Sequence, residues 1–176
     1  MNIASLLIKT SILHPNRWAI AIGGEFKSTY LDKANRVARL AGGLKDRVKV
    51  KSGHRVALAM NNCAEYSDIL FASWQIGAIT VPMNAKLHAK EFAYSIEDSG
   101  ARICFVTEDL FKAIQGSIRS LSDPPQVIVV GSQKYAGLLE ANPAELSEVK
   151  PDDVAWLFYT SGTTGRSKGA MLTHRN

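Results

Sequence analysis

The residues best suited to chemistry lie together in the stretch TSGTTGRSKG, which runs from Thr160 to Gly169. The stretch combines glycines, hydroxyl side chains and a lysine, and it contains no acidic residue. A chain of phosphates needs inward-facing backbone N–H groups, hydroxyl donors and a cation at close range. We expect Gly162, Gly165 and Gly169 to take positive φ and to let the backbone approach closely. The residues predicted to bind phosphate are Thr160, Ser161, Gly162, Thr163, Thr164, Gly165 and Lys168.

On composition alone, a stretch rich in Gly, Ser and Thr is more often a surface turn than a binding site. Two features favour binding: residues 160–163 are all hydroxyl or glycine, and the stretch follows an apolar run where α/β proteins place ligands. The phosphate loop of the common nucleoside triphosphatases does not fit. That loop needs Gly-Lys-Ser/Thr at the start of a helix, whereas Lys168 is followed by Gly169 and by a strand-like GAMLT.

The elements that must position this stretch alternate along the chain between helical patterns and short apolar, β-rich runs. We expect strands at 55–60, 78–82, 102–107, 127–130 and 154–159, with Pro82 ending the second. We expect helices at 29–44, 63–76, 89–98 and 110–118, and an irregular, partly helical connection over 131–151. This order predicts an α/β fold, a parallel-rich sheet with flanking helices around one core.

Several helix ends have recognisable signals. Thr29 is placed to cap the first helix, with Asp32 in its first turn, and Asn61-Asn62 is placed to cap the second, with Glu65 three residues on. Glycines suit the C-terminal ends, at Gly77 and at Gly100.

The stretch resembles the phosphate-binding signature of the adenylate-forming superfamily: the acyl-CoA synthetases, luciferases and peptide-synthetase adenylation domains. Their pattern is Thr-Ser-Gly-Ser/Thr-Thr-Gly-x-Pro-Lys-Gly, and residues 160–165, Lys168 and Gly169 agree with it position by position. Ser167 stands where Pro is usual, which loosens the loop but removes neither a donor nor the charge. The segments 29–44, 52–84 and 89–110 are similar to the opening third of acyl-CoA synthetases, except that His54 replaces a common Asp.

The resemblance implies an AMP-forming, long-chain fatty acid–CoA ligase-like protein. Residues 1–176 would then be the N-terminal portion of its AMP-binding (adenylation) domain, incomplete at the C-terminal end, in the acetyl-CoA synthetase-like fold. The parent enzyme would use ATP, Mg²⁺ and coenzyme A to activate a carboxylic acid, a fatty acid in the first instance, as an acyl-adenylate. Residues 160–165 and Lys168 would hold the β- and γ-phosphates. Because relatives carry their other catalytic groups further along, we expect this chain alone to be inactive, and we assign no catalytic or metal-binding residue.

Two other hypotheses stay open. One is a non-catalytic module that self-associates into a homo-oligomer or docks a partner, because an incomplete sheet exposes apolar edges. The other is weak phosphate binding without chemistry.

The remaining composition favours a cytoplasmic protein. The formal charge of +5 comes from 21 Lys/Arg against 16 Asp/Glu scattered along the chain, so we expect no nucleic-acid partner. The apolar N-terminal stretch is too short to span a membrane and is interrupted by Lys9. We interpret Cys63 and Cys104 as buried free thiols, and Trp18 as a packing residue like the other tryptophans. The dispersed histidines predict no metal site, and His174 is given a structural role in preference to one near the phosphates.

Overall fold

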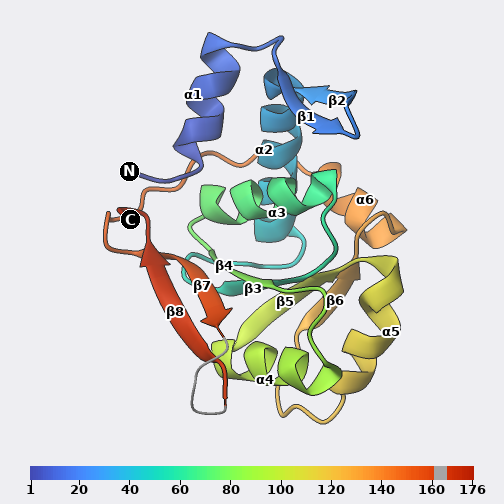
Figure 1. Ribbon diagram of the computed structural model, residues 1–176. Coiled ribbons are helices and arrows are strands. Elements are labelled where there is room, and N and C mark those ends of the chain that lie inside the picture. The colour runs from blue at the N-terminus through green and yellow to red at the C-terminus, as the bar shows by residue number, and fades with distance from the viewer. Residues whose placement is uncertain (161–165) are drawn as a thin grey trace.

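The computed structural model describes residues 1–160 and 166–176. Its centre is a six-stranded sheet with the strand order β6-β5-β3-β4-β7-β8 (Figure 1). The first five of these strands run parallel to their neighbours, and β8 is antiparallel to β7 at the edge. The strands are β3 (Arg55–Ala59), β4 (Ile79–Met83), β5 (Ala101–Val106), β6 (Gln126–Val129), β7 (Val154–Thr160) and β8 (Lys168–Thr173). The predicted α/β fold with a parallel-rich sheet is confirmed.

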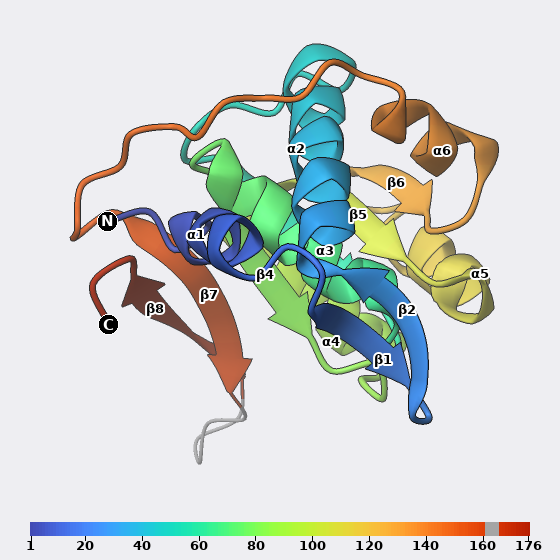
Figure 2. The same ribbon diagram turned by 90° about the horizontal axis from the view of Figure 1, so that it is seen from above.

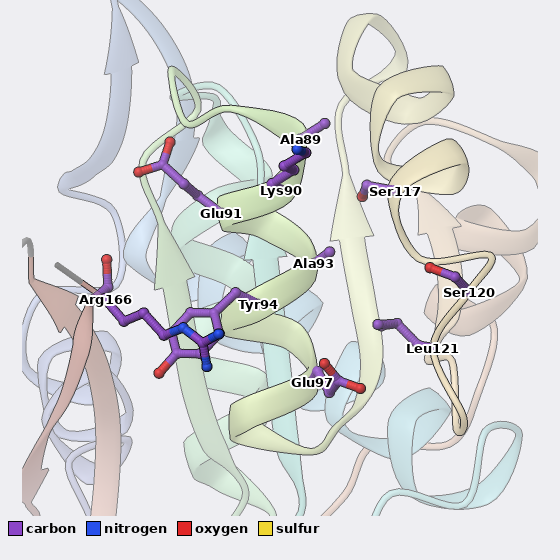
Figure 3. Close-up of a pocket in the computed structure, with 11 residues that line it drawn as sticks. Ala89, Lys90, Glu91, Ala93, Tyr94, Glu97, Ser117, Ser120, Leu121 and Arg166 are labelled. Carbon is purple, nitrogen blue, oxygen red and sulfur yellow. The ribbon is translucent and has the colours of Figure 1, made fainter.

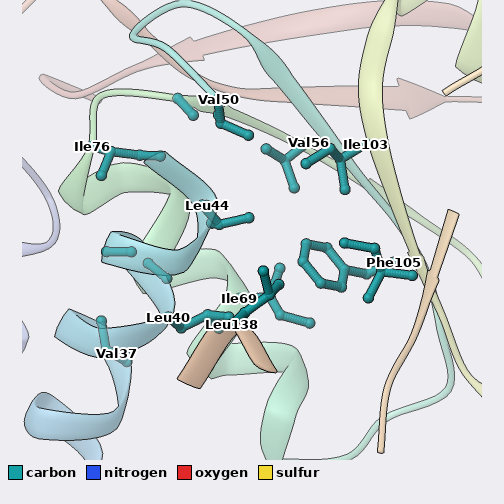
Figure 4. Packing of buried hydrophobic residues seen from close by; sticks show 14 of the residues in the cluster. Val37, Leu40, Leu44, Val50, Val56, Ile69, Ile76, Ile103, Phe105 and Leu138 are labelled. Atoms are coloured by element: carbon teal, nitrogen blue, oxygen red, sulfur yellow. The ribbon is translucent and has the colours of Figure 1, made fainter. Parts of the chain in front are cut away.

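Helices cover both faces of this sheet, as the views in Figures 1 and 2 agree. They are α1 (Ser5–Leu13), α2 (Tyr30–Asp46), α3 (Ala64–Gln75), α4 (Ala89–Ser99), α5 (Glu108–Ser117) and α6 (Gln133–Leu139). The cluster on one face joins α2, α3 and α6 to the sheet through residues such as Leu40, Ile69 and Phe105 (Figure 4). The cluster on the other face joins α4 and α5 to it, with Phe92 and Ile114 at its centre. The sheet is therefore the middle layer of three.

Helix α2 begins where the sequence predicts. The Thr29 side chain accepts a hydrogen bond from the Asp32 backbone N–H, and the Asp32 carboxylate accepts one from the Thr29 backbone N–H. The Thr29 hydroxyl also donates a hydrogen bond to Asp32 Oδ2. This bond and the one from the Thr29 backbone N–H lower the pKa of the Asp32 carboxyl, and the bond from the hydroxyl contributes most. The pair satisfies two backbone donors that a helix start leaves free.

Helix α4 lies beside the candidate site. Its N-terminus is capped reciprocally by His88 and Glu91. Its C-terminus ends at Gly100 in the left-handed region, with φ +59°. Arg55 of β3 donates hydrogen bonds to the Ser99 and Gly100 carbonyls, at 2.5 and 3.0 Å. Both ends of α4 are thus fixed.

Two predicted boundaries are wrong. The N-cap of α3 is Cys63 and not the Asn61-Asn62 pair, because the chain stays extended through Cys63 while the Asn61 side chain donates to Asp109 at 2.7 Å. Pro82 lies within β4 and does not end it. Among the described residues β4 pairs with β7 only at Thr80, so the missing N–H of Pro82 interrupts no bond of that ladder.

The N-terminal region differs most from the prediction. Helix α1 and a separate two-stranded sheet, β1 (Trp18–Ile22) with β2 (Glu25–Thr29), were not expected from the sequence. Trp18 is 60% exposed and contacts Phe26 across this small sheet, so it is not a core residue. Both cysteines are free, but only Cys104 is buried, since Cys63 lies half-buried at the start of α3.

Candidate phosphate-binding site

The predicted phosphate-binding stretch begins at the end of β7, at the edge where the parallel strands terminate. Thr160 is the last residue of β7 and is exposed. Lys168 is the first residue of β8 and lies directly opposite Thr160 in the antiparallel ladder. The hydroxyl and the ammonium group therefore come from adjacent strands at one end of the hairpin. Ser161, Gly162, Thr163, Thr164 and Gly165 lie outside the described residues, as does most of the loop 161–168 that we expect to be mobile in the isolated chain.

Gly169 has a different role from the one expected. It is not among the described glycines with positive φ; it lies in β8 opposite Tyr159. A Cβ atom at this position would come within 2.9 Å of Leu157 Cδ1 and 3.4 Å of Tyr159 Cζ. The nearer atom is the end of the Leu157 side chain, so a side chain at position 169 would have to displace Leu157, and glycine avoids this crowding beside the predicted site.

Tyr159 and Arg166, which flank residues 160–165 in the sequence, contact helix α4. The Tyr159 hydroxyl donates a hydrogen bond to Asp98 Oδ2 at 2.6 Å, and its ring packs edge-on against Tyr94 at 6.3 Å. The Arg166 guanidinium lies over the same Tyr94 ring, 5.8 Å from its centroid (Figure 3). This is within the range in which a cation is attracted to an aromatic face. These contacts could not be predicted from the sequence, because Asp98 and Tyr159 are 61 residues apart.

The Tyr159 hydroxyl remains a donor over the whole physiological range. Burial raises the pKa of Tyr159, and the hydrogen bond to the Asp98 carboxylate raises it further. The phenol therefore keeps its proton and holds the carboxylate at the end of α4.

Two hollows adjoin this region. One of about 470 Å³ opens at the carboxyl ends of β3, β4 and β7, and Asn61, Asn84, Lys86 and Phe158 are among its lining residues. The other, of about 660 Å³, extends over α4 from Arg166 to α5, with Lys90 and Glu97 on the helix surface between them (Figure 3). The first hollow lies where α/β sheets commonly bind ligands.

The other candidates from the sequence lie away from this end of the hairpin. His174 follows the far end of β8, is buried, and accepts a hydrogen bond at Nδ1 from the Ile3 backbone N–H at 3.3 Å. Asp153 accepts at a turn from the Lys150 backbone N–H, at 2.8 Å. Over residues 1–160 and 166–176, no group of three or more His, Cys, Asp or Glu side chains is arranged to hold a metal ion.

A largely parallel α/β sheet with helices on both faces, and with Thr160 and Lys168 opposed at the carboxyl end of β7, defines the class of α/β proteins whose ligand sites lie at the carboxyl ends of the strands. Comparison with known families is more specific, because the family described as "AMP-binding enzyme" matches residues 10–176. The chain belongs to this family of adenylate-forming acyl-CoA ligases, and it corresponds to their N-terminal portion.

Curated relatives include enzymes named for different acids. The chain is 34% identical over 181 residues to a feruloyl-CoA synthase of Amycolatopsis sp, covering 96% of this chain and 33% of the relative. It is 29% identical to the long-chain-fatty-acid–CoA ligase FadD13 of Mycobacterium tuberculosis, covering 99% and 35%. The chain therefore spans about a third of the length of these relatives.

Solved structures show the same fold. A fatty acyl CoA synthetase of Mycobacterium tuberculosis superposes with a TM-score of 0.85 at 28% identity, covering 98% of this chain and 34% of that one. The N-terminal domain of FACL13 from Mycobacterium tuberculosis, solved with an inhibitor, gives 0.87 at 30% identity, covering 98% and 44%. The arrangement described above is thus the family's N-terminal fold.

Proposed function

We propose that this chain carries the phosphate-binding part of an ATP-dependent acyl-CoA ligase. The observation that carries the proposal is the pattern of residues 160–169, with Thr160 and Lys168 opposed at the carboxyl edge of the sheet. In the complete reaction a carboxylate oxygen attacks the α-phosphorus of ATP, the bond to the β-phosphate oxygen breaks, and pyrophosphate leaves. Transfer of the acyl group to the thiol of coenzyme A then releases AMP.

Residues 160–165 and Lys168 would hold the β- and γ-phosphates in this reaction. Lys168 is exposed at the start of β8. Arg166, two residues earlier in the chain, is a second exposed cation of the stretch. This supports affinity for polyphosphate, and the contribution to the reaction is electrostatic and positional. Mg²⁺ is part of the proposal as the cation that would offset the negative charge of the phosphates, and no residue of this chain is assigned to hold it.

The acid substrate is proposed only as a class. Relatives named for feruloyl, 3-hydroxybenzoate, 2-succinylbenzoate and long-chain fatty acids match this chain at similar identities, between 29% and 34%. This supports a carboxylic acid with an aromatic or long aliphatic body. A fatty acid remains our first expectation, and residues 1–176 as the N-terminal portion of the adenylation domain remain our proposed domain assignment.

Calorimetry with ATP tests the phosphate assignment. Lys168→Ala removes the one lysine of the stretch, so we expect the ATP affinity to fall by about tenfold or more, as for a charge-assisted hydrogen bond. Lys112→Ala, in α5, is the matched control and should bind ATP like the wild type. Equal affinities for wild type and Lys168→Ala would refute the assignment.

ATP–pyrophosphate exchange with a panel of carboxylic acids tests the expected inactivity of this chain. Robust turnover by the chain alone would contradict that expectation.

A second candidate function, self-association, is favoured by the exposed edge of the sheet. Strand β8 has β7 as its one neighbour in the sheet, and Met171 is 68% exposed on it and Leu172 40%. Edge strands of this kind pair readily with other chains. Light scattering tests this alternative, and a strictly monomeric chain at high concentration would count against it.

No described helix is long and apolar enough to cross a membrane.

A further inference from the structure

One face of helix α4 contacts the chain both before Thr160 and after Gly165. On the upstream side, Asp98 accepts the hydrogen bond from Tyr159, the residue before Thr160. On the downstream side, Tyr94 lies under the guanidinium of Arg166. Asp98 and Tyr94 are four residues apart, so they lie one turn apart on the same face of the helix. A single helix face therefore contacts both Tyr159 and Arg166.

Helix α4 is well suited to act as a fixed reference. Phe92 and Ile96 bury its inner face at 2% and 1% exposure. Its C-terminal carbonyls accept the hydrogen bonds from Arg55, which belongs to the central strand β3. The position of Asp98, one residue before this contact, is thus set by the middle of the sheet.

The ladder that joins the hairpin to the rest of the described sheet is short. Among the described residues, β4 and β7 pair at Thr80 and Trp156, four residues before Thr160. Strand β8 is the edge of the sheet, and its residues from Lys168 to Leu172 are exposed. The contacts with α4, together with the packing of Leu157 and Tyr159 against the same face of the sheet, therefore join the end of the hairpin bearing Thr160 and Lys168 to the rest of the protein.

We propose that α4 anchors the phosphate-binding end of the β7–β8 hairpin, with Asp98 and Tyr94 as positioning residues. The proposal rests on the proposed function, because the groups being positioned are Thr160 and Lys168. Donors that are held in place before a ligand binds lose less conformational freedom on binding. Removing the anchor should therefore weaken phosphate binding while leaving every phosphate-binding residue in the sequence.

Hydrogen exchange without any ligand tests the anchor directly. The β8 amides that bond to β7 exchange when the hairpin opens locally. In Asp98→Ala and Tyr159→Phe we expect exchange near Lys168 to rise about three- to tenfold, the effect of losing one ordinary hydrogen bond. Exchange near Thr173, at the far end of the same strand, should not change. Exchange that rises equally at both ends, or at neither, would overturn the anchor.

Conservative variants separate positioning from simple destabilisation. Asp98→Asn keeps an oxygen that can accept from Tyr159, and Tyr94→Phe keeps the ring under Arg166, so both should behave like the wild type. Tyr94→Leu removes the ring and should act like Asp98→Ala. If Asp98→Asn is as impaired as Asp98→Ala, the hydrogen bond does not position the hairpin.

Titration with ATP then connects the anchor to binding, with Lys168→Ala as the reference. Asp98→Ala should lower the ATP affinity several-fold while Asp98→Asn does not, and Ile128→Val, a core variant of reduced stability, should bind like the wild type. If the wild type and Lys168→Ala show the same affinity, the proposed function fails and the exchange data still decide the anchor. If Lys168→Ala loses affinity but Asp98→Ala does not, the anchor is wrong and the proposed function stands.

Discussion

At the scale of single residues, the most buried charges of the protein lie between α2 and α3 and away from the predicted phosphate site. Lys33 Nζ lies 2.6 Å from Asp68 Oδ1, and Arg36 Nε lies 2.9 Å from Asp68 Oδ2. The Lys33 and Asp68 side chains are 6% and 5% exposed. Pairing of this kind makes burial of the two charges tolerable, because each ion satisfies the other.

Asp68→Ala tests this pairing. The variant leaves the Lys33 ammonium buried without its carboxylate, so we expect the free energy of unfolding in urea to fall by about 3–5 kcal/mol. Asp152→Ala is the control: Asp152 pairs with Arg175, but both side chains are largely exposed, and its loss should change stability little. Similar small losses in the two variants would show that burial does not strengthen the inner pair.

The phosphate stretch stands out in the sequence and its role stays a prediction, whereas the side-chain contacts of the helices could not be predicted. Glycines, hydroxyls and Lys168 are visible as a local pattern because phosphate chemistry needs them close together. Asp98 and Asp68 are acidic residues in helices, and nothing local distinguishes them from solvated ones. Their partners come from distant segments, so only the packing of the helices reveals the contacts.

At the scale of elements, α2 crosses α6 and the segment that follows it at a pair of glycines. A Cβ atom at Gly42 would collide with the Asn142 carbonyl, and one at Gly43 with the backbone of Leu138. Glycine inside a helix normally costs stability relative to alanine. Here it allows the backbones to approach so closely that no side chain fits between them.

Whether a glycine-to-alanine change raises or lowers the free energy of unfolding should therefore depend on its position. We expect Gly43→Ala to destabilise the protein by about 1–3 kcal/mol, because overpacking against backbone outweighs the gain in helix propensity. Gly116→Ala in α5 has no atom within 4 Å of the new methyl group, so it should stabilise by about 0.5–1 kcal/mol. Thermal or urea unfolding of both variants decides the matter, and a stabilised Gly43→Ala would show that the two segments can separate at little cost.

Elements with a regular apolar period could be predicted, and those without it could not. Helix α2 buries Val37, Leu40 and Leu44 on one side, as its sequence indicates. Helix α1 buries two serines and Leu7, while Ile12 and Leu13 are more than 70% exposed. This inverts the expected pattern, so α1 gives no helical signal, and the exposed β1–β2 pair gives no buried-strand signal either.

At the scale of the whole molecule, residues from the two ends of the chain pack together. The His174 ring accepts a hydrogen bond at Nδ1 from the Ile3 backbone N–H. The backbone N–H of His174 donates to the Asp153 carbonyl at 3.0 Å. Ala4 lies in the same small apolar cluster as Trp74 and Ala155. The parallel sheet and its helix layers could be inferred from the order of elements, but this closure could not, because it joins residues 171 positions apart.

The contact between His174 and Ile3 makes the stability of the protein depend on pH. Burial lowers the pKa of His174, and the nearby N-terminal ammonium lowers it further. The folded state therefore favours the neutral ring, whose Nδ1 can accept a hydrogen bond, whereas the unfolded ring titrates near 6.5. The stabilisation is present above the unfolded pKa and is lost as the pH falls below about 6.5 and through the folded pKa.

We expect the urea midpoint of the wild type to fall between pH values of about 7.5 and about 5.5, a window set by the histidine pKa. His174→Gln keeps an oxygen for the Ile3 N–H and does not titrate, so its midpoint should change less over the same interval. His54 contributes with the same sign, since burial lowers its pKa too, and His54→Gln is the matched control that should retain the part due to His174. The carboxyls with altered pKa values, Asp32 and Asp109, are shifted downward and titrate below this window. A His174→Gln variant with the full wild-type pH dependence would therefore show that the contact between the chain ends does not require a neutral imidazole.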